Sequence, residues 1–151
     1  MKTRISPRGT SRRRGSAVLE FALSATLLFM LFAGLADLTR MFYYARMVTS
    51  AAEAGVHYGM YTAANWTDYT GMQNAATASA GNVASLSAVA TSYCACPGTT
   101  GTVACASTCA GSTTPEEYVQ VTTTYPFAAV VAWPSLPSTF TISYTAVMPV
   151  Q

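Results

Sequence analysis

The sequence predicts an α+β protein whose long N-terminal transmembrane helix continues into a small extracytoplasmic domain. We expect that domain to hold a second helix, a disulfide-bonded loop and a C-terminal β-hairpin or small antiparallel sheet. Three observations support this fold class. A long apolar run follows a basic N-terminal arm, four cysteines stand in a stretch rich in Gly, Ser and Thr, and apolar residues alternate with polar ones near the C-terminus.

The composition suits a chain that lies partly in lipid or in an assembly. Only 9% of the residues are charged, against about 25% in ordinary soluble domains, and 51% are hydrophobic. A chain of 151 residues holds one compact domain, or an anchor and a small domain, but not two full-sized cores.

The first 15 residues form a basic leader. Residues 1–14 contain six basic residues and no acidic residue, whereas the rest of the chain contains two basic and six acidic residues. The basic residues of the leader are Lys2, Arg4, Arg8, Arg12, Arg13 and Arg14. A basic arm can bind nucleic acid, but this one is short and would lie against a membrane. By the positive-inside rule we expect the leader in the cytoplasm, and we expect no nucleic-acid partner.

Residues 16–36 form the predicted transmembrane helix. These 21 residues contain one charge, and as a helix they span roughly 30 Å, the thickness of a bilayer's hydrocarbon core. A buried helix of a soluble protein is an alternative, but the rest of the chain is too small to enclose it. A secretion signal cleaved before Asp37 is another, but the apolar run is longer than a usual signal core and contains a carboxylate. We therefore favour an anchor, with residues 37–151 outside the cytoplasm.

Glu20 is the ionisable residue inside this apolar run, and such residues are costly in lipid and often functional. In the simpler interpretation, Glu20 lies near the cytoplasmic boundary and its side chain reaches water. In the second, a cut between Gly15 and Ser16 removes the leader and creates an α-amino group on Ser16. That amine would pair with Glu20 of a neighbouring subunit, because two charges that are each costly in lipid become tolerable together.

Beyond the apolar run, we expect the helix to continue to about Met60. Apolar residues recur there at spacings of three and four, which is typical of a helix. This stripe consists of Leu38, Met41, Ala45, Val48, Ala52 and Val56. It would pack either on the chain's own domain or on a partner. Asp37 and Arg40 stand three positions apart, so we expect them to pair where the helix leaves the membrane.

A second helix is predicted from Thr70, because Thr70 and Gln73 fit a capping box. Its thin apolar stripe would consist of Met72, Ala76, Ala80, Val83, Leu86 and Ala90. The many alanines and serines of this segment suit close helix packing, but they also suit a flexible stretch.

Residues 92–114 are predicted to form a loop that holds the four cysteines, Cys94, Cys96, Cys105 and Cys109. A zinc site is the alternative, but the spacing lacks the usual paired C-x-x-C, and the expected topology places the loop in an oxidising compartment. We therefore predict two disulfides. Four cysteines allow three connectivities, and the sequence does not choose among them. The geometrically simplest is a nested pair, Cys94–Cys109 with Cys96–Cys105.

The β region is predicted at residues 117–148. Alternate side chains share one face in residues 118–125 and again in residues 140–148. The first face holds Val119, Val121, Thr123 and Tyr125, and the second holds Phe140, Ile142, Tyr144 and Ala146. Residues 126–134, between them, form an apolar segment bounded by prolines. If exposed, this segment would contact a partner or the membrane, and if folded back it would join the core.

The N-terminal motifs resemble the TadE-like family, pseudopilins or minor pilins of the tight-adherence (Tad, Flp-type) pilus assembly system. The similar segments are residues 13–23 (RRGSAVLEFAL), 34–43 (GLADLTRMFY) and 51–59 (AAEAGVHYG). The β-like C-terminal part is also similar to the family's pattern. Major pilins of the Flp type tend to have tyrosine directly after the glutamate, whereas this chain has Phe21, which favours a minor or pseudopilin role.

The resemblance implies a function in pilus biogenesis, surface adherence and biofilm formation. It implies processing between Gly15 and Ser16 by a prepilin peptidase, and a role for Glu20 in subunit registration. The implied partners are other pilins or pseudopilins and Tad assembly proteins. The implied location is the bacterial inner membrane, crossed once, with the N-terminus in the cytoplasm and residues 37–151 in the periplasm. Incorporation into a surface pilus after processing is left open.

No combination of residues in the sequence indicates catalysis. The chain lacks a Ser/His/Asp set in a suitable context, a histidine cluster for a metal and a glycine-rich phosphate loop, and its single histidine, His57, suits packing or the surface. We therefore expect a structural and assembly protein, not an enzyme, with no cofactor or metal. The alternative function is a signal-anchored or secreted periplasmic binding module whose disulfide-stapled loop captures a ligand.

Overall fold

The computed structural model describes residues 12–62, 64–81, 83–99, 101–131 and 137–150. These residues form two helices and four strands: α1 (Arg12–Met60), α2 (Tyr69–Ser79), β1 (Ser87–Ala95), β2 (Thr102–Val103), β3 (Glu116–Ala128) and β4 (Thr139–Pro149). The strands make one antiparallel sheet in the order β2-β1-β3-β4. The α+β class, the long N-terminal helix, the second helix and the C-terminal antiparallel sheet are as the sequence predicted.

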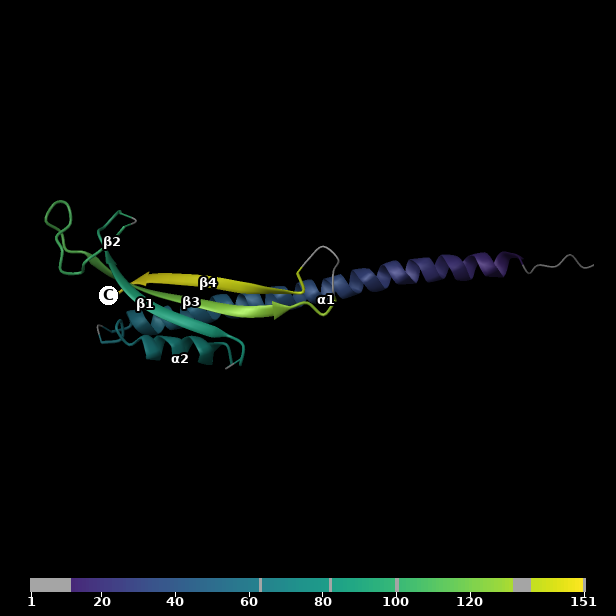
Figure 1. Ribbon diagram of the computed structural model, residues 1–151, viewed down its shortest axis with the longest axis horizontal. Helices are drawn as coiled ribbons and strands as arrows, with labels where there is room; N and C mark the ends of the chain where they lie inside the picture. The colour runs from purple at the N-terminus through teal and green to yellow at the C-terminus, as the bar shows by residue number, and fades with distance from the viewer. Residues whose placement is uncertain (1–11, 63, 82, 100, 132–136, 151) are drawn as a thin grey trace, which may run out of the picture.

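Helix α1 forms the long axis of the molecule (Figure 1). Its C-terminal half packs against β3, β4 and α2, whereas its N-terminal half projects beyond the sheet. Strand β3 runs toward the projecting half, and β4 returns from there (Figure 1). The turn end of the β3–β4 hairpin, where β3 stops and β4 begins, therefore lies near the point where α1 leaves the domain.

The core lies between α1, α2 and one face of the sheet. Its main cluster consists of Ala52, Val56, Met72, Ala76, Ala90, Val119, Val121 and Ala146. On β3 the buried residues alternate through Val119, Val121 and Thr123, the face that the sequence alternation predicted. On α1 the outer part of the predicted stripe, from Val48 to Val56, is buried in the chain's own domain.

Two glycines let α1 approach α2 and β3 closely. A Cβ atom at Gly55 would lie 3.0 Å from the carbonyl oxygen of Met72 and 3.0 Å from a methyl group of Val121. A Cβ atom at Gly59 would lie 2.6 Å from the sulfur of Met72, whose side chain is fully buried. These positions accommodate no larger side chain without displacing the core, so the glycines set the spacing of the layers.

The second helix differs in detail from its prediction. It begins after Asp68, whose carboxylate accepts a hydrogen bond of 2.9 Å from the backbone N–H of Gly71, so Asp68 and not Thr70 is the N-cap. The helix ends at Ser79, and Gly81 follows with a φ of 67°, which breaks the helical path. Of the predicted stripe, Ala80, Val83 and Leu86 therefore lie beyond the helix, and Ala90 lies in β1.

Candidate functional site

The N-terminal half of α1 presents apolar side chains outward. Among the described residues, α1 over residues 15–60 is the one helix long and apolar enough to cross a membrane by length and composition. Its apolar part is not covered by the domain, and Phe21 and Phe29 are each 75% exposed. A core helix of a soluble protein would be mostly buried, so this half of α1 is a candidate membrane span.

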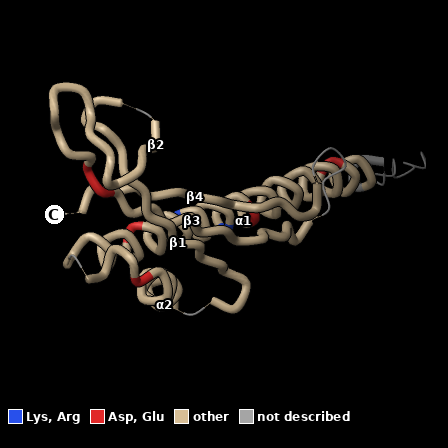
Figure 2. The backbone as a smooth tube through the Cα atoms, turned by 60° about the vertical axis from the view of Figure 1, so that its left-hand side comes forward, with Lys and Arg blue, Asp and Glu red and all other residues tan. Residues whose placement is uncertain are grey.

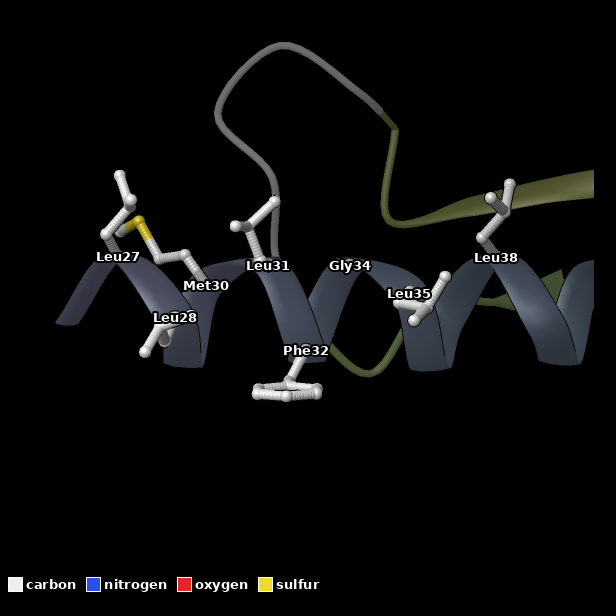
Figure 3. Close-up of a pocket in the computed structure, with 8 residues that line it drawn as sticks. All are labelled: Leu27, Leu28, Met30, Leu31, Phe32, Gly34, Leu35 and Leu38. Carbon is white, nitrogen blue, oxygen red and sulfur yellow. The ribbon is translucent and has the colours of Figure 1, made fainter. Parts of the chain in front are cut away.

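One side of the projecting helix has the spacing of a helix-packing seam. Leu31 and Leu38 project from the same side of α1, with Gly34 between them (Figure 3). The surrounding surface of this part of the helix is apolar on both sides and consists of Leu27, Leu28, Met30, Leu31, Phe32, Gly34, Leu35 and Leu38. Steps of three and four residues keep side chains on one face, and a glycine lets another helix approach closely in a membrane.

Gly15, Ser16 and Glu20 lie in the first turns of α1, and all three are exposed. A Cβ atom at Gly15 would meet no atom within 4 Å, so the fold does not require glycine there. No hydrogen bond or ion pair joins Glu20 to another described residue. Ser16 and Glu20 are separated by about one helical turn, or roughly 6 Å along the axis, on the same exposed part of the helix.

Asp37 joins α1 to the turn end of the β3–β4 hairpin. It is 8% exposed, and its Oδ1 accepts hydrogen bonds from Arg40 at 3.2 Å and from the backbone N–H of Val130 at 3.0 Å. Its Oδ2 accepts from the backbone N–H of Val131 at 3.1 Å. The predicted pair of Asp37 with Arg40 is confirmed. The two backbone contacts span more than 90 residues of sequence, and no local pattern signals them.

Aromatic side chains also pack between α1 and the turn end of the β3–β4 hairpin. The guanidinium of Arg40 lies 5.5 Å from the ring centroid of Phe127, and Phe127 lies 5.1 Å from Phe140 on the paired strand. One turn further along α1, the ring of Tyr44 stacks on that of Tyr125 at 4.3 Å. These contacts make the end of the hairpin and the neighbouring turns of α1 one packed unit.

The four cysteines form two disulfides, Cys94–Cys105 and Cys96–Cys109, with Cα–Cα distances of 5.1 and 5.7 Å. The two disulfides are present as predicted, but the nested connectivity is wrong. Strand β1 extends to Ala95 and pairs Cys94 with Val103 of β2, which brings Cys105 next to Cys94. The segment 92–114 is thus partly strand, and the β1–β2 register decides the pairing.

Charged residues are sparse along the described chain (Figure 2). Within the residues that the structure describes, no group of three or more His, Cys, Asp and Glu side chains could hold a metal ion. His57 is exposed near the end of α1. In the part of the chain that the structure describes, the candidate site thus offers apolar surfaces and the ion pair of Asp37 with Arg40.

Comparison with known proteins gives one family. Residues 15–57 match the family model described as TadE-like protein, and this match begins at Gly15 and includes Glu20, Asp37 and Arg40. No curated protein and no solved structure matches the chain. The family association points to a protein of the Tad pilus system. The match over residues 15–57 confirms the TadE-like resemblance that the N-terminal motifs indicated.

Proposed function

We propose that this protein is a pseudopilin or minor pilin that takes part in the assembly of a Tad (Flp-type IV) pilus, for surface adherence and biofilm formation. The observation that carries the proposal is the projecting half of α1. It is apolar and uncovered, it holds Glu20 as its one charge between residues 16 and 36, and it lies within the family match. A helix of this kind suits lateral packing with other subunits in lipid or in a filament.

In this proposal the chain crosses the bacterial inner membrane once. The basic leader, residues 1–15, lies in the cytoplasm, residues 16–36 span the membrane, and residues 37–151 lie in the periplasm. The excess of basic residues before the span supports this direction. The two disulfides support it as well, because disulfides persist in oxidising compartments and are rare in the cytosol.

A prepilin peptidase cuts between Gly15 and Ser16, and the Ser16 amine of one subunit then pairs with Glu20 of the next. The two groups are about 6 Å apart along the helix axis, so parallel helices displaced by about one turn would bring an amine level with a neighbour's carboxylate. The pairing offsets the cost of holding each charge in an apolar surrounding. The partners would be other pilins or pseudopilins and Tad assembly proteins.

The substitution Glu20→Gln tests this role. It removes the charge but keeps size and hydrogen bonding, so it should ease membrane insertion and leave protein level and cleavage intact. Co-purification with pilus subunits should fall several hundred-fold, because breaking a buried charge pair costs about 3–5 kcal/mol. The matched control is Glu53→Gln, an exposed acid in the outer part of α1, which should co-purify like the wild type.

Normal co-purification and normal pilus counts for Glu20→Gln, at wild-type protein levels, would contradict the pairing and leave Glu20 as a residue that merely reaches water. The mature N-terminus separates the remaining alternatives. A start at Ser16 supports the pilin-like role, whereas a start at Asp37 would indicate a secreted binding module and a start at Met1 an unprocessed anchor.

A further inference from the structure

The turn end of the β3–β4 hairpin is fixed at one level along α1. Asp37 directly follows the apolar segment of residues 16–36, and it holds the backbone N–H groups of Val130 and Val131 at 3.0 and 3.1 Å. Those two residues therefore lie level with the point where the proposed span ends. The rest of the sheet extends away from this point along the outer half of α1 (Figure 1).

The surface at this level is apolar and continuous with the projecting helix. Val130 is 74% exposed, and Leu35 and Leu38 on α1 are 59% and 46% exposed. A groove between the helix and the hairpin is lined by Gly34, Asp37, Leu38, Met41, Phe127, Ala129 and Phe140. Such a surface is unfavourable in water, and it adjoins the projecting half of α1, which suits lipid by length and composition.

The backbone N–H groups of the same segment are satisfied from within the protein. The N–H of Ala129 donates to the carbonyl oxygen of Ser138 at 3.0 Å, and the next two N–H groups donate to Asp37. The Asp37 carboxylate also accepts from Arg40. An irregular backbone costs less in an apolar surrounding when its N–H groups have partners, and a charge costs less there when it is paired. Both conditions are met at this segment.

We propose that residues 129–131 lie in the outer leaflet of the bilayer beside α1 and give the domain a second contact with lipid acyl chains. The Asp37 carboxylate is the clamp that holds this segment at membrane level. The lipid contacts of α1 and of residues 129–131 together fix the tilt and rotation of the sheet relative to the membrane. The lipid contact of α1 alone would leave both free. This inference depends on the membrane span proposed above, but not on the pilus role.

The test measures contact with lipid in the full chain, reconstituted at one copy per nanodisc. A fluorescent label is attached to Val130→Cys, and quenching by lipids brominated in the upper part of the acyl chains is recorded. Because the native cysteines are all disulfide-bonded, only the added thiol reacts without reductant. Leu28→Cys, in the proposed span, is the positive control. Val89→Cys is the negative control, since Val89 is 57% exposed and pairs with Thr122, about 20 Å from the end of β3.

Quenching at Val130 should be several-fold stronger than at Val89 and of the same order as at Leu28. Quenching at Leu28 but only background quenching at Val130 would overturn this inference while leaving the span intact. Quenching at neither position would instead show that the span itself is wrong. Background quenching at Val130 in single-copy discs, together with cross-linking between the Val130→Cys thiols in discs with two copies, would identify a second chain as the occupant and also overturn the proposal.

Discussion

The hydroxyl of Thr123 donates a hydrogen bond of 2.7 Å to the backbone carbonyl of Val48, and so joins β3 to α1 across 75 residues of sequence. Both residues are fully buried. The contact places a polar group in the middle of an apolar interface, where it contributes to stability only in one register of the strand against the helix. It thus helps to fix how far the hairpin reaches along α1 toward the projecting half of the helix.

Replacing Thr123 by Val should lower the free energy of unfolding by about 1 kcal/mol. The shape is kept and the Val48 carbonyl retains its bond within the helix, so the loss is that of one hydrogen bond. Thr122→Val is the matched control, because the Thr122 hydroxyl contacts Thr145 on the exposed face of the same strand. Denaturant unfolding of the full chain in detergent measures both. Equal effects of the two substitutions would show that the buried bond adds nothing.

The disulfide connectivity gives the second prediction. Replacing Cys94 and Cys105 together by Ala should leave Cys96–Cys109 intact, with no thiol that alkylates without reductant. Replacing Cys94 and Cys109 together removes one partner from each bond and should leave two reactive thiols. Intact mass after alkylation distinguishes the two variants. Two reactive thiols in the first variant and none in the second would restore the nested connectivity.

Much of the fold could be predicted because its signals are local. The apolar run and the stripe that follows it specify α1, and alternation specifies the buried face of β3. Strand β1 was missed because its sequence, SAVATSYCA, is rich in small residues, and nine paired positions with β3 make it a strand. Tertiary pairing of this kind overrides weak local preference.

The cysteine pairing and the Asp37 clamp could not be predicted for the same reason. Cys94 forms its disulfide with Cys105 because the register of β1 with β2 brings the two residues together. That register is a property of the folded sheet. Asp37 accepts a hydrogen bond from Val130 because β3 ends beside the turn of α1 where that helix leaves the domain. The sequence shows only that an acid stands there beside Arg40. At the candidate processing site, by contrast, Gly15, Ser16 and Glu20 are close in sequence, so local spacing sufficed to propose them.

Stability should depend on pH through Tyr58, near the end of α1, and Asp68, the N-cap of α2. The N–H of Gly71 and the hydroxyl of Tyr58, at 2.8 Å, lower the pKa of Asp68 below its ordinary value of 3.8. The carboxylate therefore favours the folded state above about pH 4, and this contribution is lost as the pH falls through the lowered pKa. The same hydrogen bond raises the pKa of Tyr58 above 10.0, so its contribution is lost as the pH rises through that raised value.

The thermal midpoint of the full chain should thus be flat between these limits and fall outside them. Tyr58→Phe removes the hydroxyl and should weaken the dependence at both ends, whereas Tyr61→Phe, at an 84% exposed tyrosine, should leave it unchanged. Because the pair is exposed, added salt should shrink the effect. A wild-type pH profile reproduced by Tyr58→Phe would show that other groups cause it.

Processing at Gly15 gives the last prediction. Because a Cβ atom at this position would meet no atom within 4 Å, and the neighbouring turns of the helix are exposed, Gly15→Leu should leave the fold undisturbed and act only on recognition by the peptidase. With its own prepilin peptidase present, the wild-type chain should start at Ser16, and the Gly15→Leu chain should keep all six basic residues of the leader. Ser16→Ala, a small change on the other side of the bond, should still be cut. N-terminal sequencing and intact mass of the membrane-extracted protein measure this. Cleavage of the Gly15→Leu chain at the same bond would show that glycine is not the recognised residue.

Gly15→Leu should also lower the amount of this subunit in sheared surface pili, while its level in the membrane stays normal. The reason is that an uncut chain would keep its positive charges in the cytoplasm, and these would oppose extraction of α1 from the membrane into a filament.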